Sequence, residues 1–192
     1  MAKKESNFMN MVLTLLIVTL VASTTLGFVY EFTKAPIAAS KLAKKNNAIK
    51  EVVPDFDNVP TEEAYNLPVE GGEVICYPAR KNGELTGTAI STYTNKGFSG
   101  TIKLMVGLLP DGTINDIAVL EHKETPGLGD KMEKSKSDFS VQFQGKNPEN
   151  FQLLVSKDGG DVNAITASTI SSRAYCDAVE RAYNAYMEGG KK

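Results

Sequence analysis

Hydrophobic and polar positions divide the chain into an apolar N-terminal segment and a longer region of mixed character. No charged residue occurs between Glu5 and Glu31, and the run 8–30 is almost entirely apolar or small. As an α-helix rising about 1.5 Å per residue, this run spans the ~30 Å hydrocarbon core of a bilayer. The pattern therefore predicts a transmembrane helix over residues 8–30, preceded by a short N-terminus of residues 1–7.

A cleaved signal peptide is the alternative interpretation, with Lys3 and Lys4 as its basic region and Ala22-Ser23-Thr24 as its cleavage site. The apolar character continues through Leu26–Tyr30, which is longer than a signal peptide needs and favours a retained anchor. Charge alone leaves the orientation open, because basic residues flank both ends of the span. Those after the span are Lys34, Lys41, Lys44 and Lys45.

Residues 31–72 are predicted to be a connecting helix and loop. Pro36 marks the exit from the membrane helix, and apolar positions separated by lysines over Ile37–Val53 predict a helix that Pro54 stops. Residues 54–72 contain three prolines and a Gly-Gly pair, so we expect them to be mostly loop.

The pattern then changes to short runs typical of β-strands. Strands are expected over Glu73–Ala79, Leu85–Thr94, Gly100–Leu109 and Ile114–Glu121. The dipeptide Asn82-Gly83 between the first two is a strong hairpin signal. Pro110-Asp111-Gly112-Thr113 predicts a second hairpin between the last two.

The C-terminal region is predicted to end in an amphipathic helix. Before it we expect a Pro/Gly loop over 123–130, a short helix or turn near 131–137 and a strand over Phe151–Val155. From Ile170 onward, apolar residues recur at helical spacing, with Thr169 or Ser171 as the cap and Gly189-Gly190 as the end. The fold class is therefore α+β: an N-terminal transmembrane helix, then a domain over 73–192 with an antiparallel sheet flanked by helices.

Composition narrows the possible functions. The 192 residues carry a net charge of −2 without a basic stripe, which argues against a nucleic-acid partner. Cys76, Cys176 and the single His122 cannot form a typical Cys/His metal site. Free thiols are favoured over a disulfide between the two cysteines. Redox chemistry would then require a bound organic cofactor.

Two loops combine hydroxyl groups or glycines with the start of a helix. Thr166–Ser172 places several hydroxyls at the N-terminus of the last helix, where unpaired N–H groups and the helix dipole favour a phosphate. Glu124–Gly129, with the sequence ETPGLG, has glycines that allow a flat ligand to approach the backbone, and Leu128 could cover a ring face. Taken alone, the first is a run of capping hydroxyls and the second is a turn.

Together these segments resemble a known family. Thr166–Ser172 resembles the flavinylation motif of FMN-binding domains, Glu124–Gly129 matches their ETPGLG loop, and Gly97–Gly107 resembles their glycine-rich strand entry. The order of the segments, the single anchor and the length resemble the G subunit of the Rnf electron-transport complex. The C subunit of the sodium-pumping NADH:quinone reductase is its close relative. The chain departs from the motif at three positions, with Ala167 for glycine, Ser168 for alanine and Asn163 for aspartate.

The resemblance implies a covalent cofactor. In this family a separate flavin transferase joins the FMN phosphate to a threonine as a phosphoester, which places FMN on Thr169 as a tether rather than as a catalyst. Ser168 offers a rival hydroxyl one residue away. The resemblance implies no catalytic residue and no metal. The expected cofactor-binding residues are Thr169, Ser168, Thr166, Glu124, Thr125, Gly127 and Leu128.

The resemblance also implies a location and partners. The chain would be a single-pass protein of the cell inner membrane, with a cytoplasmic N-terminus and an extracytoplasmic FMN domain. Its partners would be the other membrane subunits of the Rnf complex, where it carries electrons on a path between ferredoxin and NAD coupled to ion translocation. The alternatives are a stand-alone flavinylated reductase and a flavin-free membrane-anchored scaffold. Arg173 could contact the phosphate or be solvated, and His122 could transfer protons or be structural.

Overall fold

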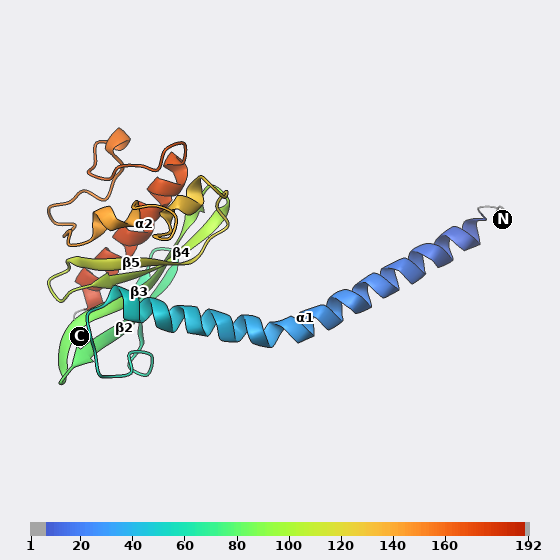
Figure 1. Cartoon of the computed structure of the whole chain (residues 1–192), viewed down its shortest axis with the longest axis horizontal. Coiled ribbons are helices and arrows are strands. Elements are labelled where there is room, and N and C mark those ends of the chain that lie inside the picture. The colour runs from blue at the N-terminus through green and yellow to red at the C-terminus, as the bar shows by residue number, and fades with distance from the viewer. Residues whose placement is uncertain (1–6, 191–192) are drawn as a thin grey trace. The chain divides into compact units, whose positions relative to one another are not determined.

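The structure, a computed structural model, describes residues 7–190 and contains two compact units, Met1–Ala43 and Lys44–Lys192. The first element, α1 (Phe8–Val52), is one continuous helix of 45 residues with Pro36 inside it (Figure 1). The prediction that Pro36 separates two helices is therefore wrong. Proline removes one backbone hydrogen bond and crowds the preceding turn, but a helix can continue through it.

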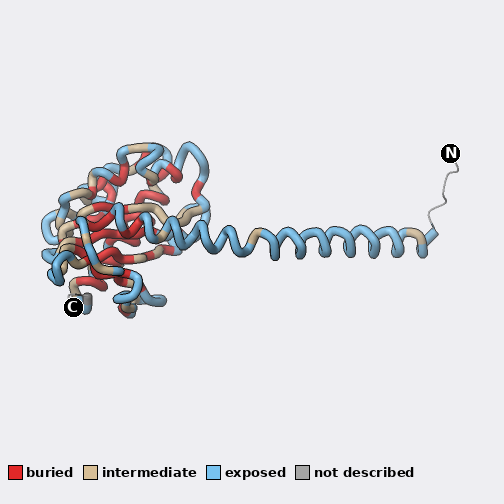
Figure 2. The backbone as a smooth tube through the Cα atoms, turned by 60° about the horizontal axis from the view of Figure 1, so that its bottom comes forward, coloured by how far each residue is buried: buried red, intermediate tan, exposed pale blue. Residues whose placement is uncertain are grey.

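The first part of α1 has the properties of a membrane span. Among residues 7–190, α1 is the one helix long and apolar enough to cross a membrane, and its most apolar stretch has no buried side chains within the structure. Figure 2 shows the N-terminal part of the helix as mostly exposed, with short interruptions of intermediate burial. The predicted N-terminus of residues 1–7, with Lys3 and Lys4, lies outside the described residues except for Asn7.

Five strands form one antiparallel sheet in the second unit (Figure 1). The strands follow each other in space in the order of the chain, each pairing with the next as a meander. They are β1 (Tyr65–Val69), β2 (Gly72–Lys81), β3 (Glu84–Gly97), β4 (Gly100–Leu108) and β5 (Ile114–Glu121). The α+β fold class and the four strands predicted from Glu73 onward are confirmed.

The first predicted hairpin is confirmed. Lys81 pairs with Glu84 across the turn, and Asn82 and Gly83 have φ values of 53° and 83°. Two central residues with positive φ are typical of the type I′ turn, whose twist matches that of paired strands.

Strand β1 was not predicted. Its residues fall in the segment expected to be loop, and they pair with β2 from Tyr65↔Cys76 to Val69↔Gly72. Pro68 is tolerated because β1 lies at the edge of the sheet, where one side of the strand needs no partner. With β1 and the last turns of α1, the compact unit begins at Lys44, earlier than the domain start at Glu73 that the sequence suggested.

Both faces of the sheet are covered. On one face, α2 (Thr169–Ala185) and the segment before it pack against β-strand side chains such as Ile90 and Leu104. On the other face, Ile49 and Val52 at the end of α1 pack against Tyr77, Ala89 and Met105. Since neighbours along a strand point to opposite faces, the alternation within β2, β3 and β4 supplies both cores.

The segment between β5 and α2 is mostly irregular, with three short 3₁₀ turns. They are η1 (Gly129–Met132), η2 (Ser140–Phe143) and η3 (Ser156–Asp158), and a single π turn, η4 (Tyr186–Gly190), follows α2. The predicted strand over Phe151–Val155 is wrong, since only Val155 forms an isolated bridge, to Val162. Leu153 and Val155 are buried, and they hold this irregular segment against the core. Their alternating burial resembles that of a strand, but the segment does not pair along its length with a strand of the sheet.

The two cysteines are free thiols in the same core. Burial raises the pKa of Cys76 to about 11 and that of Cys176 to about 12. Both thiols are therefore protonated at neutral pH and poor nucleophiles.

Candidate functional site

The loop after β5 contains a tight turn. The Leu128 N–H donates to the Thr125 carbonyl at 3.2 Å, and Gly127 has a φ of 78°. Proline in the second position and a left-handed glycine in the third are typical of a type II turn. Gly127 is thus required by the backbone of the turn, which presents Leu128 with 40% of its surface exposed.

Glu124, the first residue of this loop, is only 5% exposed. Its Oε1 accepts a hydrogen bond of 2.9 Å from the Ser99 N–H, in the turn between β3 and β4. Its Oε2 accepts one of 2.5 Å from Ser171 Oγ, in the first turn of α2. A buried carboxylate needs such partners, and here they join three segments that are distant in the sequence.

Gly129 lies against the same carboxylate. A Cβ at this position would be 2.7 Å from Ser171 Oγ and 2.8 Å from Glu124 Oε2, too close for any side chain. The glycine therefore allows the loop to approach the start of α2.

The hydroxyl groups at the start of α2 form a short chain. Ser168 occupies the N-cap position without making a side-chain cap, and its Oγ donates to Ser171 Oγ at 2.9 Å. Ser171 in turn donates to Glu124, while Ser172 Oγ donates to the Ser168 carbonyl. The prediction that Thr169 or Ser171 caps the helix is therefore wrong, because Ser171 is engaged with the loop and Ser168 holds the cap position.

These segments enclose a cavity of about 340 Å³, within the size range of small-molecule sites. Three large apolar side chains around it are exposed to solvent: Phe98 by 67%, Leu128 by 40% and Ile170 by 48%. The lining residues are Phe98, Glu124, Thr125, Leu128, Gly129, Ala167, Ser168, Thr169, Ile170 and Ser171. The cavity thus combines exposed apolar side chains with buried carboxylate and hydroxyl groups, a combination that suits a flat, partly polar ring.

Comparison with known proteins supports a flavin site. A model of the FMN-binding domain family matches residues 97–184. The G subunit of the ion-translocating oxidoreductase complex of Shewanella piezotolerans is 31% identical over 185 residues, covering 90% of this chain and 86% of the relative. The G subunit of Vibrio atlanticus is 36% identical over 172 residues, covering 84% and 82%. This chain belongs to the G-subunit family.

A solved structure, Shewanella oneidensis NqrC, resembles part of the chain. The TM-score is 0.40 at 23% identity, over 62% of this chain and 57% of that one.

The cavity of this G subunit lies within its FMN-binding domain. All lining residues, from Phe98 to Ser171, fall inside residues 97–184. The residues around the cavity fit FMN. Exposed apolar side chains can cover the faces of the flavin ring, and the N-terminus of α2 offers the phosphate N–H groups that have no partner in the helix.

The structure brings most of the predicted site residues together. Thr169, Ser168, Glu124, Thr125 and Leu128 all line the cavity. The other two predicted residues do not: Gly127 belongs to the type II turn, and Thr166 borders a neighbouring depression with Asn163 and Lys131.

The predicted cofactor-binding residues did not include Phe98, Gly129, Ala167, Ile170 or Ser171, although the glycines of 124–129 and the hydroxyls of 166–172 were expected near a ligand. Phe98 had a usable signal, since a large apolar side chain between Gly97 and Ser99-Gly100 in a turn has no core to enter. Ile170 and Ser171 directly follow the threonine of the motif.

The two candidate acceptor hydroxyls differ in their surroundings. Ser168 is buried, and its hydroxyl proton is directed at Ser171. Thr169 is half-buried, and its hydroxyl has no hydrogen bond to any of residues 7–190. The Thr169 oxygen is thus the more available of the two for a new covalent bond.

Ala167 has an unusual backbone conformation. Its φ is 60°, in the left-handed region that glycine adopts without steric cost. The glycine expected at this position from the flavinylation motif would adopt this conformation without steric cost, whereas alanine bears the strain.

We expect Ala167→Gly to stabilise the chain by about 1 kcal/mol. The left-handed conformation costs alanine about 1–2 kcal/mol, and the greater freedom of glycine in the unfolded chain offsets part of the gain. Thermal unfolding of the full chain in detergent should show a midpoint higher by about 3 °C. Ala178→Gly, inside α2, is the control and should lower the midpoint, since glycine is unfavourable within a helix.

Arg173 does not face the cavity. Its guanidinium makes two hydrogen bonds with Asp158, of 2.6 and 2.7 Å, and this pair lowers the pKa of the Asp158 carboxyl. The phosphate contact considered for Arg173 would require breaking a bidentate ion pair.

Proposed function

We propose that this G subunit carries FMN as a phosphoester on Thr169 and acts as an electron carrier in an ion-translocating oxidoreductase complex. Membership of the family and the FMN-binding domain make the chain an FMN-carrying electron-transfer protein. The observation that carries the covalent part is the free Thr169 hydroxyl at the edge of the cavity, beside a buried and engaged Ser168.

The residues around the cavity would hold the two parts of FMN differently. Phe98, Leu128 and Ile170 would flank the ring with apolar surface, and Thr125 would offer a polar group at its edge. The start of α2 would place its positive dipole end beside the phosphodiester, which keeps about one negative charge. When bound, the flavin supplies the redox chemistry, and the protein supplies its position and electrostatic surroundings.

Covalent attachment suits a carrier with an open site. The three apolar side chains at the cavity are 40% or more exposed, so a non-covalent flavin would be only partly enclosed. A tether retains the cofactor regardless of its free concentration. Its formation would need a flavin transferase and an activated FMN donor with a phosphoanhydride bond. The Thr169 oxygen would bond to the FMN phosphorus as the anhydride bond breaks, the other phosphate half would leave, and the hydroxyl proton would pass to a base or to solvent.

The membrane segment fits the same role. The uncharged run 8–30 within α1 would be a retained single-pass anchor in the inner membrane. We place the N-terminus in the cytoplasm and the FMN domain outside it, with the other membrane subunits of the Rnf complex as partners. Electrons would pass along a path between ferredoxin and NAD.

Intact mass of the full chain, purified from membranes of cells that co-express a flavin transferase, tests the proposal. We expect a mass increase of one phosphoester-linked FMN, with peptide mapping to Thr169. Flavin colour that is lost on denaturation, without added mass, would indicate non-covalent binding. Absence of both would favour a flavin-free scaffold, and rapid reduction of soluble acceptors by the isolated chain would favour a reductase.

A further inference from the structure

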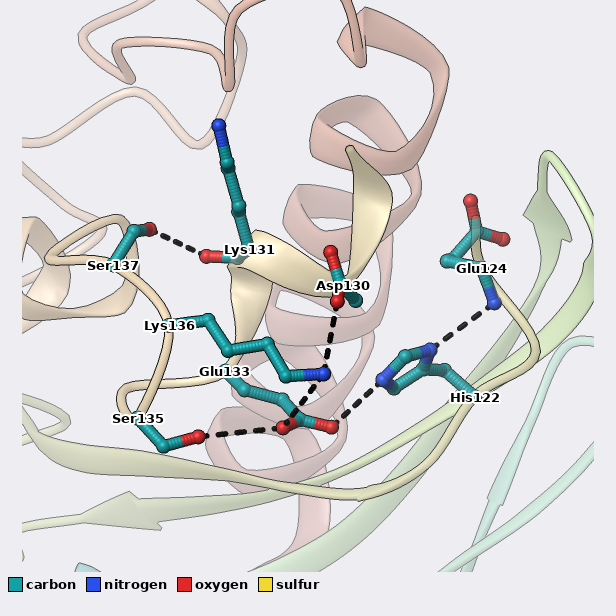
Figure 3. Close-up of polar contacts among 8 residues, drawn as sticks. All are labelled: His122, Glu124, Asp130, Lys131, Glu133, Ser135, Lys136 and Ser137. Atoms are coloured by element: carbon teal, nitrogen blue, oxygen red, sulfur yellow. Dashed lines mark hydrogen bonds and ion pairs between the residues drawn. The ribbon is translucent and has the colours of Figure 1, made fainter. Parts of the chain in front are cut away.

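His122 lies between the end of β5 and the loop 124–129, and its side chain is 12% exposed. Its Nδ1 accepts a hydrogen bond of 3.1 Å from the backbone N–H of Glu124, and its Nε2 is 2.8 Å from Glu133 Oε1 (Figure 3). A nitrogen that accepts carries no proton, so Nε2 bears the hydrogen and donates it to Glu133. The imidazole is thus neutral in this arrangement, with each ring nitrogen in a defined role.

The far end of the loop is fixed to the same network. Lys136 Nζ is 2.9 Å from Asp130 Oδ2, directly after the loop, and 3.5 Å from Glu133 Oε2. The hydrogen bond from Lys136 lowers the pKa of Asp130. Although burial opposes it, the hydrogen bond from His122 and the charge of Lys136 also lower the pKa of Glu133.

These four residues, His122, Asp130, Glu133 and Lys136, form a continuous set of contacts that we call the clasp. Figure 3 shows it joining the strand end before the loop to the η1 turn after it, while the side chain of the neighbouring Lys131 points away. The loop between these ends, 124–129, contributes Glu124, Thr125, Leu128 and Gly129 to the cavity. The clasp itself contributes no residue to the cavity lining.

We propose that His122 is a positioning residue for the flavin-binding loop, acting through the Glu124 backbone N–H and held in its tautomer by Glu133. The proposal rests on the proposed function, because the loop matters through the cofactor it borders. Fixing the Glu124 backbone fixes the start of the side chain that reaches Ser99 and Ser171. His122 therefore sets the geometry of the cavity without touching its contents.

Two substitutions separate the two ring nitrogens. In His122→Asn, the amide oxygen takes the place of Nδ1 and can still accept from Glu124. In His122→Gln, the amide nitrogen takes the place of Nε2 and can still donate to Glu133. Because the inferred role depends on Nδ1, Asn should rescue loop order and Gln should not. His122→Phe removes both contacts.

The first measurement is hydrogen exchange of the full chain in detergent, without flavin. In His122→Gln and His122→Phe, the hydrogen-bonded amides of the loop, those of Glu124, Leu128 and Asp130, should exchange about fivefold faster, the effect of losing one hydrogen bond. In His122→Asn, the exchange rates of the same amides should match those of the wild type. The exchange rates of the β3 and β4 amides should be unchanged in both His122→Asn and His122→Gln. Equal exchange in the Asn and Gln variants, or an unaltered loop in Gln, would overturn the proposal.

The second measurement uses the flavin-loaded chain. Fluorescence anisotropy and visible circular dichroism of the flavin should change in Gln and remain as in the wild type in Asn. A loop that loosens without any change in flavin signal would also overturn the positioning role. If the wild-type chain gains no flavin at all, the proposed function fails, while the exchange experiment still decides whether His122 holds the loop.

Discussion

Thr169→Val is expected to leave the chain entirely without covalent FMN. Valine has nearly the same shape as threonine but no oxygen to form the phosphoester. The Thr169 hydroxyl makes no hydrogen bond with the described part of the chain, so its loss should change the free energy of unfolding by less than about 0.5 kcal/mol. Intact mass after co-expression with a flavin transferase should therefore show an unmodified chain. Thermal unfolding of the same variant should give the wild-type midpoint.

Ser168→Ala is the matched control. It removes the neighbouring hydroxyl, which is buried and donates to Ser171, and should retain one FMN per chain. Loss of its hydrogen bond should destabilise the chain by about 1 kcal/mol. Ser168→Ala should thus keep its flavin and lose stability, whereas Thr169→Val should lose its flavin and keep its stability. The assignment fails if the valine variant keeps its flavin or if the alanine variant loses it.

The parts of the fold that local chemistry determines could be predicted from the sequence. Asn82-Gly83 and Pro110–Thr113 gave both hairpins because turn residues act on their own backbone. The apolar spacing after Ile170 gave α2 because one face of a helix must be buried. The two prolines Pro36 and Pro68 led to wrong predictions. The helix α1 continues through Pro36, and Pro68 is accepted in β1 because this strand lies at the edge of the sheet, which the local sequence does not reveal.

The site shows the same division. The motif and the ETPGLG loop identified Thr169, Thr125 and Leu128, which all line the cavity. What local sequence could not supply was the pairing of distant segments, such as Phe98 reaching the cavity from the β3–β4 turn. The capping prediction failed for this reason too, because Ser171 binds a carboxylate 47 positions away in preference to its own backbone.

Glu124→Ala is expected to destabilise the chain by about 3 kcal/mol and to open the cavity. The substitution removes the acceptor of two hydrogen bonds, to the Ser99 N–H and to Ser171 Oγ, and hydrogen bonds to a charged group contribute about 1.5–3 kcal/mol each. Water entering the vacated space would recover part of the loss. Denaturant unfolding of the full chain should give the free energy, and flavin incorporation should fall because three segments around Thr169 lose their common partner.

Glu124→Gln distinguishes the hydrogen-bond network from simple loss of volume. The amide oxygen can still accept from the Ser99 N–H, but the amide nitrogen must donate to Ser171, which reverses the direction of the Ser171–Ser168 hydroxyl chain. Ser168 then needs a new acceptor, so we expect a smaller loss of about 1 kcal/mol and retained flavin. If the glutamine variant were as unstable as the alanine variant, the negative charge itself would be required. If both were as stable as the wild type, the carboxylate would not be holding the loop, the turn and the helix together.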